Sequence, residues 1–252
     1  MTPPPPPPAT VILSPHFDDA VLSLAGLIPA LDSPVTVVTV YGGAPCPGQE
    51  VSWWDTTCGF SSGGEAHLAR VAEDTRACAL LGAERVVLGH PDGPYGDGGP
   101  LHEIDTYLAD LAPGTRLLIP LGTNQADHAK VRDRALRVLG ELGRPLPLVY
   151  ADLPYTGHLK EWGSADTDAA LAVDADFGRA YQDIASRYRT RTVHDLTLSD
   201  QQWAAKRAAV LCYASQLAPL AIDHDRVMAR GGPLRAERVW ALEEPGSPGE
   251  SG

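Results

Sequence analysis

The stretch VILSPHFDDAVLSLAG, from Val11 to Gly26, constrains the fold of this 252-residue chain more than any other segment. It opens with three apolar residues, 11–13, which have the length and composition of a buried parallel strand. Pro15 ends that strand, and from Ala20 to Leu27 the apolar residues recur at helical spacing. A strand that passes directly into a helix is the repeating unit of an α/β fold, and the sequence therefore predicts one here.

Three groups able to do chemistry lie on the turn between this strand and helix: His16, Asp18 and Asp19. In open α/β sheets such turns lie at the carboxyl ends of the strands, where ligands bind. His16 and Asp19 can converge on one point, which leaves Asp18 free to face a bound molecule. The alternative is that one carboxylate only caps the helix. A cap needs one carboxylate and no histidine, so the stretch favours a binding site.

The rest of the chain alternates between strand-like and helix-like segments. We expect further strands at 35–40, 85–88, 117–121, 146–151 and 238–242, and helices at 65–81, 101–111, from 128 to about 142, and 199–217. The segment after the fifth strand is expected to be mainly helical. This alternation predicts a single Rossmann-like α/β domain over residues 11–244, with a doubly wound and mostly parallel sheet.

The two ends and one long loop depart from this alternation. Residues 1–10 contain six consecutive prolines and predict a disordered lead, and residues 245–252 predict a disordered tail. The loop at 42–63 is rich in glycine, proline and serine, and loops of this length are usually functional or disordered. Its adjacent Trp53 and Trp54 fit either an apolar or sugar-stacking wall or an anchor to the core.

Charge and hydropathy limit the partners and the location of the protein. The formal net charge of −12 leaves no basic surplus to attract nucleic acids or anionic membranes. No segment has the length of a membrane span or the pattern of a signal peptide, which predicts a cytoplasmic protein. The four cysteines lack CxxC spacing, so free thiols are expected, although Cys46 and Cys58 could pair in an oxidising compartment.

A second motif, Asp127-His128, follows the strand at 117–121 and begins a helix, as the first motif does. Together with His16 and Asp19, His128 gives two imidazoles and one carboxylate, a usual shell for catalytic zinc with an open position for water. Zinc lowers the pKa of bound water to about 7, and Asp18 could accept the proton. This set suits hydrolysis of an amide or ester. A nucleotide-binding Rossmann domain would instead carry GxGxxG after the first strand.

At these motifs the chain resembles the LmbE-like, or PIG-L, zinc-dependent N-deacetylases, from Val11 to about Leu217. The family's SPHxDD, RxxE helix ending in LG, PDG loop and late KxxAxxxYxSQ helix are similar to four parts of this sequence: 14–19; Arg70, Glu73, Ala77 and Leu81-Gly82; 91–93; and Lys206, Ala209, Tyr213, Ser215 and Gln216. Members deacetylate N-acetylglucosamine units in thiol-cofactor precursors, glycolipid-anchor precursors and antibiotic intermediates. The resemblance implies an amide hydrolase acting on a small acetylated amino sugar.

The resemblance also implies roles for individual residues. The metal ligands would be His16, Asp19 and His128, with Asp18 as the general base. Arg70 and Asp92 lie where the family contacts the sugar. The sequence also allows these two residues simpler structural roles: an ion pair between Arg70 and Glu73 on one helix face, and a turn position for Asp92 before Gly93.

One position departs from the family, whose second signature is HxDH. Here Gln125 replaces the first histidine, which normally stabilises the oxyanion or protonates the leaving amine while Asp127 orients it. A glutamine amide can donate a hydrogen bond but cannot deliver a proton. Asp18 could return the proton it takes, another group such as His90, His158 or His194 could substitute, or the activity could be weak. The alternative function is therefore a metal-binding member that binds an acetylated sugar without efficient turnover.

Overall fold

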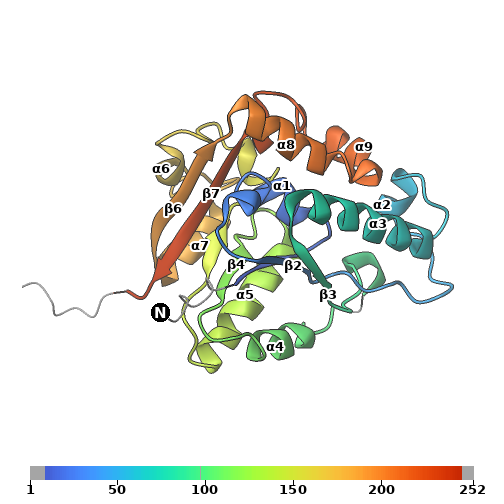
Figure 1. The fold of residues 1–252 in the computed structure, drawn as a ribbon, viewed down its shortest axis with the longest axis horizontal. Helices are drawn as coiled ribbons and strands as arrows, with labels where there is room; N and C mark the ends of the chain where they lie inside the picture. Colours follow the sequence, from blue (N-terminus) through green and yellow to red (C-terminus); the bar gives the residue numbers. More distant parts are fainter. Residues whose placement is uncertain (1–8, 97, 246–252) are drawn as a thin grey trace, which may run out of the picture.

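The computed structural model describes residues 9–96 and 98–245, and its centre is one seven-stranded sheet (Figure 1). The strand order is β3-β2-β1-β4-β5-β7-β6, in which the first five strands are parallel and β7 and β6 add two antiparallel pairs. The strands are β1 Thr10–Ser14, β2 Val35–Thr39, β3 Glu84–Val87, β4 Arg116–Pro120, β5 Leu148–Tyr150, β6 Arg189–Thr197 and β7 Ala236–Glu243. The predicted mostly parallel α/β sheet is confirmed.

Helices cover both faces of the sheet (Figure 1). One face packs against α1 Asp19–Leu24, α3 Gly63–Leu81, α8 Asp200–Val210 and α9 Ala214–Asp223. The other packs against α4 His102–Ala109, α5 Ala126–Glu141, α6 Thr167–Leu171 and α7 Arg179–Arg187. A further short helix, α2 Trp53–Thr57, lies in the loop before α3. The sheet is therefore doubly wound, as predicted.

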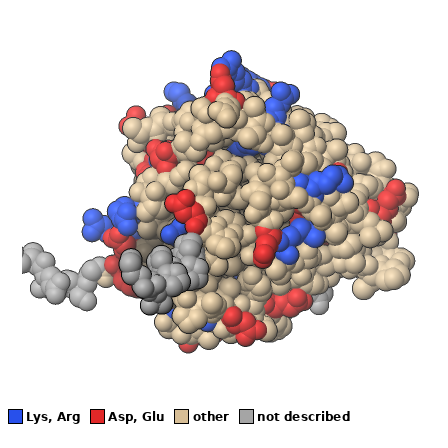
Figure 2. Space-filling view, viewed as in Figure 1, with Lys and Arg blue, Asp and Glu red and all other residues tan. Residues whose placement is uncertain are grey.

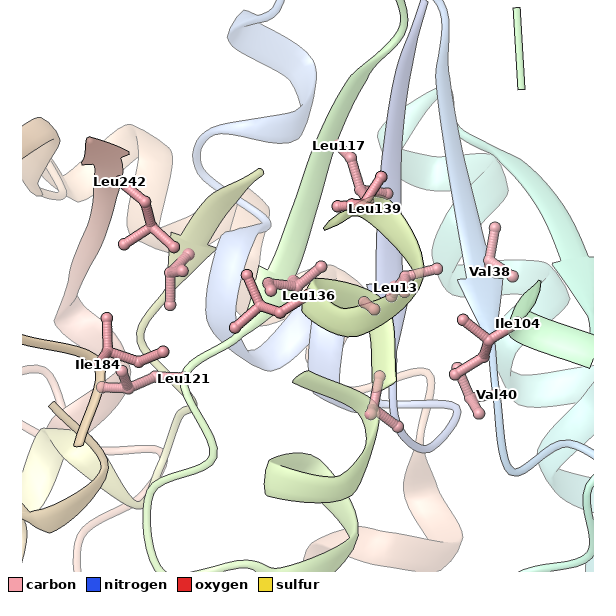
Figure 3. Close-up of a cluster of buried hydrophobic side chains, with 14 of the residues drawn as sticks. Leu13, Val38, Val40, Ile104, Leu117, Leu121, Leu136, Leu139, Ile184 and Leu242 are labelled. Carbon is pink, nitrogen blue, oxygen red and sulfur yellow. The ribbon is translucent and has the colours of Figure 1, made fainter. Parts of the chain in front are cut away.

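Strand alternation divides the core between the two faces. On β1, Ile12 packs with the α1–α3–α8 layer, whereas Leu13 packs with the opposite layer. Figure 3 shows that second layer, where Leu136 and Leu139 of α5 lie against the sheet and Ile104 of α4 lies near β2. Because β1 and β4 are buried on both faces, their carboxyl ends are held rigidly, and both predicted motifs begin there.

A buried ion pair joins α8 to β7. Lys206 Nζ on α8 lies 2.8 Å from Glu237 Oε1 on β7, and both side chains have no exposed surface. The same carboxylate accepts hydrogen bonds from the backbone N–H groups of Gly26 and Leu27, at 2.7 and 2.8 Å. Glu237 thus ties the residues that follow α1, and the middle of α8, to the antiparallel part of the sheet.

Several predicted elements need correction. The sequence predicts helix where the structure has β6, whose alternating residues pair with β7 at the edge of the sheet. The predicted helix at 199–217 is two helices, because α8 ends before Tyr213 and α9 begins after it. Thr10 belongs to β1 and not to the lead, and the loop at 42–63 contains α2. The predictions for residues 1–8 and 246–252 lie outside the described residues, and the domain limits 11–244 stay a prediction.

The surface carries acidic and basic side chains mixed together on the face shown in Figure 2. The four cysteines are free thiols, as expected, because none forms a disulfide. No helix within the described residues has the length and hydropathy needed to cross a membrane. The predicted cytoplasmic location stays a prediction.

Candidate active site

The turn after β1 is held in shape by its own side chains. Ser14 Oγ accepts a hydrogen bond from the Ala20 backbone N–H at 2.9 Å, and one carboxylate oxygen of Asp19 accepts from the His16 N–H at 2.7 Å. Asp18 occupies the N-cap position of α1, but its side chain makes no capping hydrogen bond. The simple capping role is therefore wrong for Asp18, whose carboxylate lines a cavity instead.

The carboxyl ends of β1 and β4 bring three predicted ligand residues together. Asp19 Oδ2 lies 3.2 Å from His16 Nδ1 and 3.2 Å from His128 Nε2. One ligand atom from each of the three residues lies within 4.8 Å of the others. Two imidazole nitrogens and a carboxylate oxygen at this spacing could hold one metal ion.

The far side of the His128 ring is fixed by a buried carboxylate. His128 Nδ1 lies 2.7 Å from Asp152 Oδ1, and the other oxygen of Asp152 accepts from the backbone N–H groups of Gly122 and Thr123 at 2.6 and 3.1 Å. Gly122 has a φ of +89°, and a Cβ there would lie 2.8 Å from Ala129 Cα. Only glycine fits this close approach of the β4 loop to α5, and the N–H groups of that loop hold the Asp152 carboxylate beside His128.

These residues fit a zinc ion on three counts. The donor set of two histidines and one aspartate is the usual protein shell of a catalytic zinc with an open position. In addition, His128 Nε2 is buried and makes no hydrogen bond of acceptable geometry among the described residues, although Asp19 Oδ2 lies 3.2 Å away. A buried imidazole nitrogen without a partner is costly unless a ligand occupies it. The contact with Asp152 also matches the carboxylate–histidine–metal pattern of metal sites.

A second cluster of possible metal ligands shares His16 with the first cluster. His16 Nε2 is 3.3 Å from Asp92 Oδ1 and 3.8 Å from Asp127 Oδ2, so these three residues also form a cluster that could hold a cation. The two clusters use opposite nitrogens of the same ring. If Asp92 accepts the proton on Nε2, then Nδ1 carries the lone pair and points to Asp19, so Asp92 would orient His16 for the first cluster.

The two aspartates of the turn have opposite electrostatic environments. Burial, reinforced by the nearby charge of Asp19, raises the pKa of Asp18 to about 7. Burial also acts on Asp19, but His128 and His16 outweigh it and hold the pKa of Asp19 well below its usual range. Asp19 is thus a permanent anion, whereas Asp18 can both accept and release a proton near neutral pH.

A cavity of about 290 Å³ opens over these residues. One wall is formed by two helices that are distant from each other in sequence, since Trp54 Nε1 of α2 donates to Gln216 Oε1 of α9 at 2.9 Å. Tyr213, between α8 and α9, donates to the backbone oxygen of Phe17 in the turn itself. Trp54 therefore lines the cavity and is also anchored, whereas Trp53 is 73% exposed.

Arg70 and Glu73, one turn apart on α3, make two different contacts. Arg70 lines the cavity and pairs with Asp55 of α2, which also accepts from the hydroxyl of Tyr95. Glu73 instead accepts from the backbone N–H and the hydroxyl of Ser215, at 2.8 and 2.7 Å. The alternative of an Arg70–Glu73 ion pair is therefore wrong.

Asp92 lies both at a turn and in the wall of the cavity, and its predicted contact with a sugar stays a prediction. It occupies a turn, since its carboxylate accepts from the Gly93 N–H at 2.7 Å, and it also lines the cavity. A turn position and a place in the site are therefore compatible for this residue.

Gln125 and Asp127 also line the cavity, at the start of α5. Three histidines could have replaced the missing one. His90, His158 and His194 do not line this cavity, although His158 contacts His224, which does. Sequence reasoning missed His224, which lines the cavity directly. No local pattern marks His224, because it follows α9 and reaches the cavity only through tertiary packing.

Comparison with known proteins gives matches in structure alone. No protein-family model matches the chain, and neither does any curated protein. The solved structure of the A40926 pseudoaglycone deacetylase Dbv21 matches with a TM-score of 0.65 and 24% identity, over 94% of this chain and 98% of that one. The zinc-inhibited form of the teicoplanin deacetylase Orf2 matches with a TM-score of 0.68 and 21% identity, over the same shares of the two chains.

A third similar structure has a different activity. GalB, a 4-carboxy-2-hydroxymuconate hydratase from Pseudomonas putida, matches with a TM-score of 0.57 and 18% identity, over 95% of this chain and 98% of that one. At these identities the likeness shows that the chain has the fold of these proteins. Because deacetylases and a hydratase share that fold, the reaction must be argued from the site.

Proposed function

We propose that the protein is a zinc-dependent N-deacetylase of the LmbE-like family, which hydrolyses the N-acetyl group of an N-acetylglucosamine-type sugar. The observation that carries this proposal is the cluster of His16, Asp19 and His128 in one cavity with Asp18. The carboxylate of Asp18 makes no capping hydrogen bond to α1. The similarity in fold to two deacetylases of antibiotic intermediates supports it. In this proposal Arg70 and Asp92 contact the sugar.

The ligand set would hold zinc through His16 Nδ1, a carboxylate oxygen of Asp19 and His128 Nε2. Bound zinc supplies Lewis-acid polarisation of the acyl carbonyl and lowers the pKa of a water to about 7. Asp18 removes a proton from the attacking water, for which a pKa of about 7 is well matched near neutral pH. The protonated Asp18 then returns that proton to the departing amine nitrogen.

Gln125 acts at the position where the family has a histidine. Its amide N–H donates a hydrogen bond toward the acyl oxygen as negative charge develops there. Asp127 contributes by its contact with His16, whose Nε2 lies 3.8 Å from its carboxylate. In this scheme Asp18 carries all the proton transfer, which is why the site can work without the second histidine.

A second candidate function is supported by one observation. Gln125 cannot deliver a proton, so the chain could bind zinc and an acetylated sugar with little turnover. The two functions predict the same metal content but different rates. They are separated by the experiment that follows.

The test measures amine release from a panel of N-acetylglucosaminides. Protein stripped with a chelator should be inactive, and one equivalent of zinc should restore turnover. The metal is limited to one equivalent because a zinc-inhibited form is known for the similar deacetylase Orf2. Equal turnover by the stripped and the zinc-restored protein would contradict the proposal. If the unmodified protein binds zinc but shows no turnover, and the Gln125→His variant gains turnover, the second function is favoured.

The buried Asp152 provides a separate prediction about the metal. Replacing it with asparagine should weaken zinc binding by about 10- to 100-fold, because the carboxylate no longer orients His128 or raises its basicity. Zinc affinity is measured by competition with a chromophoric chelator. Asp110→Asn, at an exposed position beyond the end of α4, is the matched control and should leave the affinity unchanged. Equal affinities for the two variants would contradict the orienting role.

A further inference from the structure

Four tyrosines line the cavity that holds the candidate site: Tyr41, Tyr95, Tyr155 and Tyr213. The hydroxyls of Tyr95 and Tyr213 are already engaged, since each donates to a buried aspartate. The hydroxyl of Tyr41 is fully buried. The hydroxyl of Tyr155 makes no hydrogen bond with any described residue and, unlike that of Tyr41, is not sealed by its neighbours. Of these four tyrosines, Tyr155 therefore presents an open and unused donor to the cavity.

The loop that carries Tyr155 is held on both sides of this residue. The Leu153 N–H donates to Ser23 Oγ at 3.0 Å. The Thr156 N–H donates to the backbone oxygen of Asp152 at 2.8 Å. Asp152 is also the residue whose carboxylate contacts a proposed metal ligand. One loop thus positions both that carboxylate and the Tyr155 ring, and a catalytic group needs such a fixed support.

The Tyr155 ring lies against the proposed metal ligand His128. The two rings meet edge to face at 85°, with their centroids 5.6 Å apart. Burial, together with the charges of Asp19 and Asp18, raises the pKa of Tyr155 above the ordinary value of a phenol, which is already about 10. The hydroxyl is therefore protonated near neutral pH and can donate a hydrogen bond. The two aspartates whose charges reach it are the proposed ligand and the proposed base.

A neutral donor beside these groups is suited to the charge that develops during amide hydrolysis. When water attacks the acyl carbon, negative charge builds up on the acyl oxygen. A fixed donor aimed at that oxygen stabilises the transition state more than the ground state. Ionised carboxylates such as Asp19 accept hydrogen bonds but cannot donate them. Tyr155 and Gln125, which line the same cavity, both carry neutral donors.

We propose that Tyr155 is a catalytic residue, whose hydroxyl donates a hydrogen bond to the acyl oxygen as the amide is attacked. It acts together with the Gln125 amide, so that two neutral donors face the developing charge. The inference rests on the proposed deacetylase function. It deepens that function by assigning a role to a residue of the loop after β5, which none of the sequence motifs contains.

The test replaces Tyr155 with phenylalanine, which keeps the ring against His128 and removes only the hydroxyl. In zinc-loaded protein, kcat for amine release from N-acetylglucosaminides should fall by about 10²- to 10³-fold, the usual loss for one such donor, with KM within about twofold. Zinc affinity should not change. Tyr107→Phe, on α4 and outside the cavity, is the matched control. A kcat within about threefold of that of the unmodified protein would overturn the inference and leave the proposed function intact.

A binding measurement tests the same hydrogen bond without turnover. The probe is the methylphosphonamidate of glucosamine, in which a tetrahedral phosphorus replaces the acetyl carbon and an anionic oxygen replaces the acyl oxygen. In calorimetry, Tyr155→Phe should weaken binding of this probe by about the factor lost in kcat/KM, and should leave glucosamine binding within about twofold. This result supports the inference even if no panel sugar is hydrolysed.

Three outcomes of the binding measurement count against the inference. Equal affinity of the unmodified protein and Tyr155→Phe for the probe would overturn it. An equal loss for the probe and for glucosamine would make Tyr155 a ground-state contact, which would also overturn it. Failure of the unmodified protein to bind the probe would overturn the inference together with the proposed function.

Discussion

Replacing Asp18 with asparagine should lower turnover by about 10²- to 10⁴-fold, the usual contribution of a general acid–base group. Asparagine has nearly the same size but can neither take a proton from water nor return one to the amine. Zinc binding should persist, because Asp18 is not one of the three clustered ligand residues. The measurement pairs the rate of amine release with the zinc content of the same protein sample.

The Asp18 prediction has a clear contrary outcome. Turnover within about threefold of the unmodified protein would remove Asp18 from the proton transfer and leave the mechanism without its base. Loss of both zinc and turnover would instead make Asp18 part of the metal shell. The exposed Asp110→Asn variant, which has the same charge change, controls for the effect of one lost carboxylate on the protein as a whole.

Replacing Lys206 with methionine should destabilise the fold by about 3–5 kcal/mol, because it leaves the charge of Glu237 buried without its partner. Methionine keeps the length and apolar character of the side chain, so the loss is mainly electrostatic. The free energy of unfolding is measured by urea denaturation. Turnover per folded molecule should change little, because Lys206 does not line the cavity.

A double-mutant cycle isolates the Lys206–Glu237 interaction. The variant with both Lys206→Met and Glu237→Gln should lose less stability than the sum of the single variants, since no uncompensated charge remains. Arg191→Met provides the matched control, because its ion pair with Glu243 is largely exposed, at 62% and 41%. Exposed pairs contribute about 0–1 kcal/mol. A Lys206→Met cost as small as that of Arg191→Met would contradict the prediction.

The parts of the fold that could be predicted from sequence are those where local signals agree. The strand and helix around Pro15 have clear apolar periods, so the βα unit and its ligand-binding edge follow directly. β6 could not be predicted as readily, because an edge strand with alternating exposed residues, such as Arg189 and Arg191, buries little apolar surface. The break at Tyr213 is similarly hidden, since helix-forming residues continue on both sides.

The candidate site also has residues that could be predicted from the sequence and residues that could not. His16, Asp19 and His128 could be named because each lies at the end of a recognisable strand, where topology alone brings them together. Asp152 and His224 could not be named, because their positions depend on packing between distant segments. Asp152 follows the short β5, and its role is visible only in its contact with His128. His224 has no marker in the sequence and reaches the cavity from the end of α9.

The separate origins of the reactive edge and the cavity wall have a consequence for how such a protein diversifies. The proposed metal ligands and base come from the turn after β1 and from the first turns of α1 and α5, whereas Trp54 and Gln216 on the wall come from α2 and α9. Insertions or exchanges in α2 and α9 would change which molecules enter while the reactive edge is inherited intact. Selection can therefore alter what enters the cavity independently of the reaction carried out at the sheet.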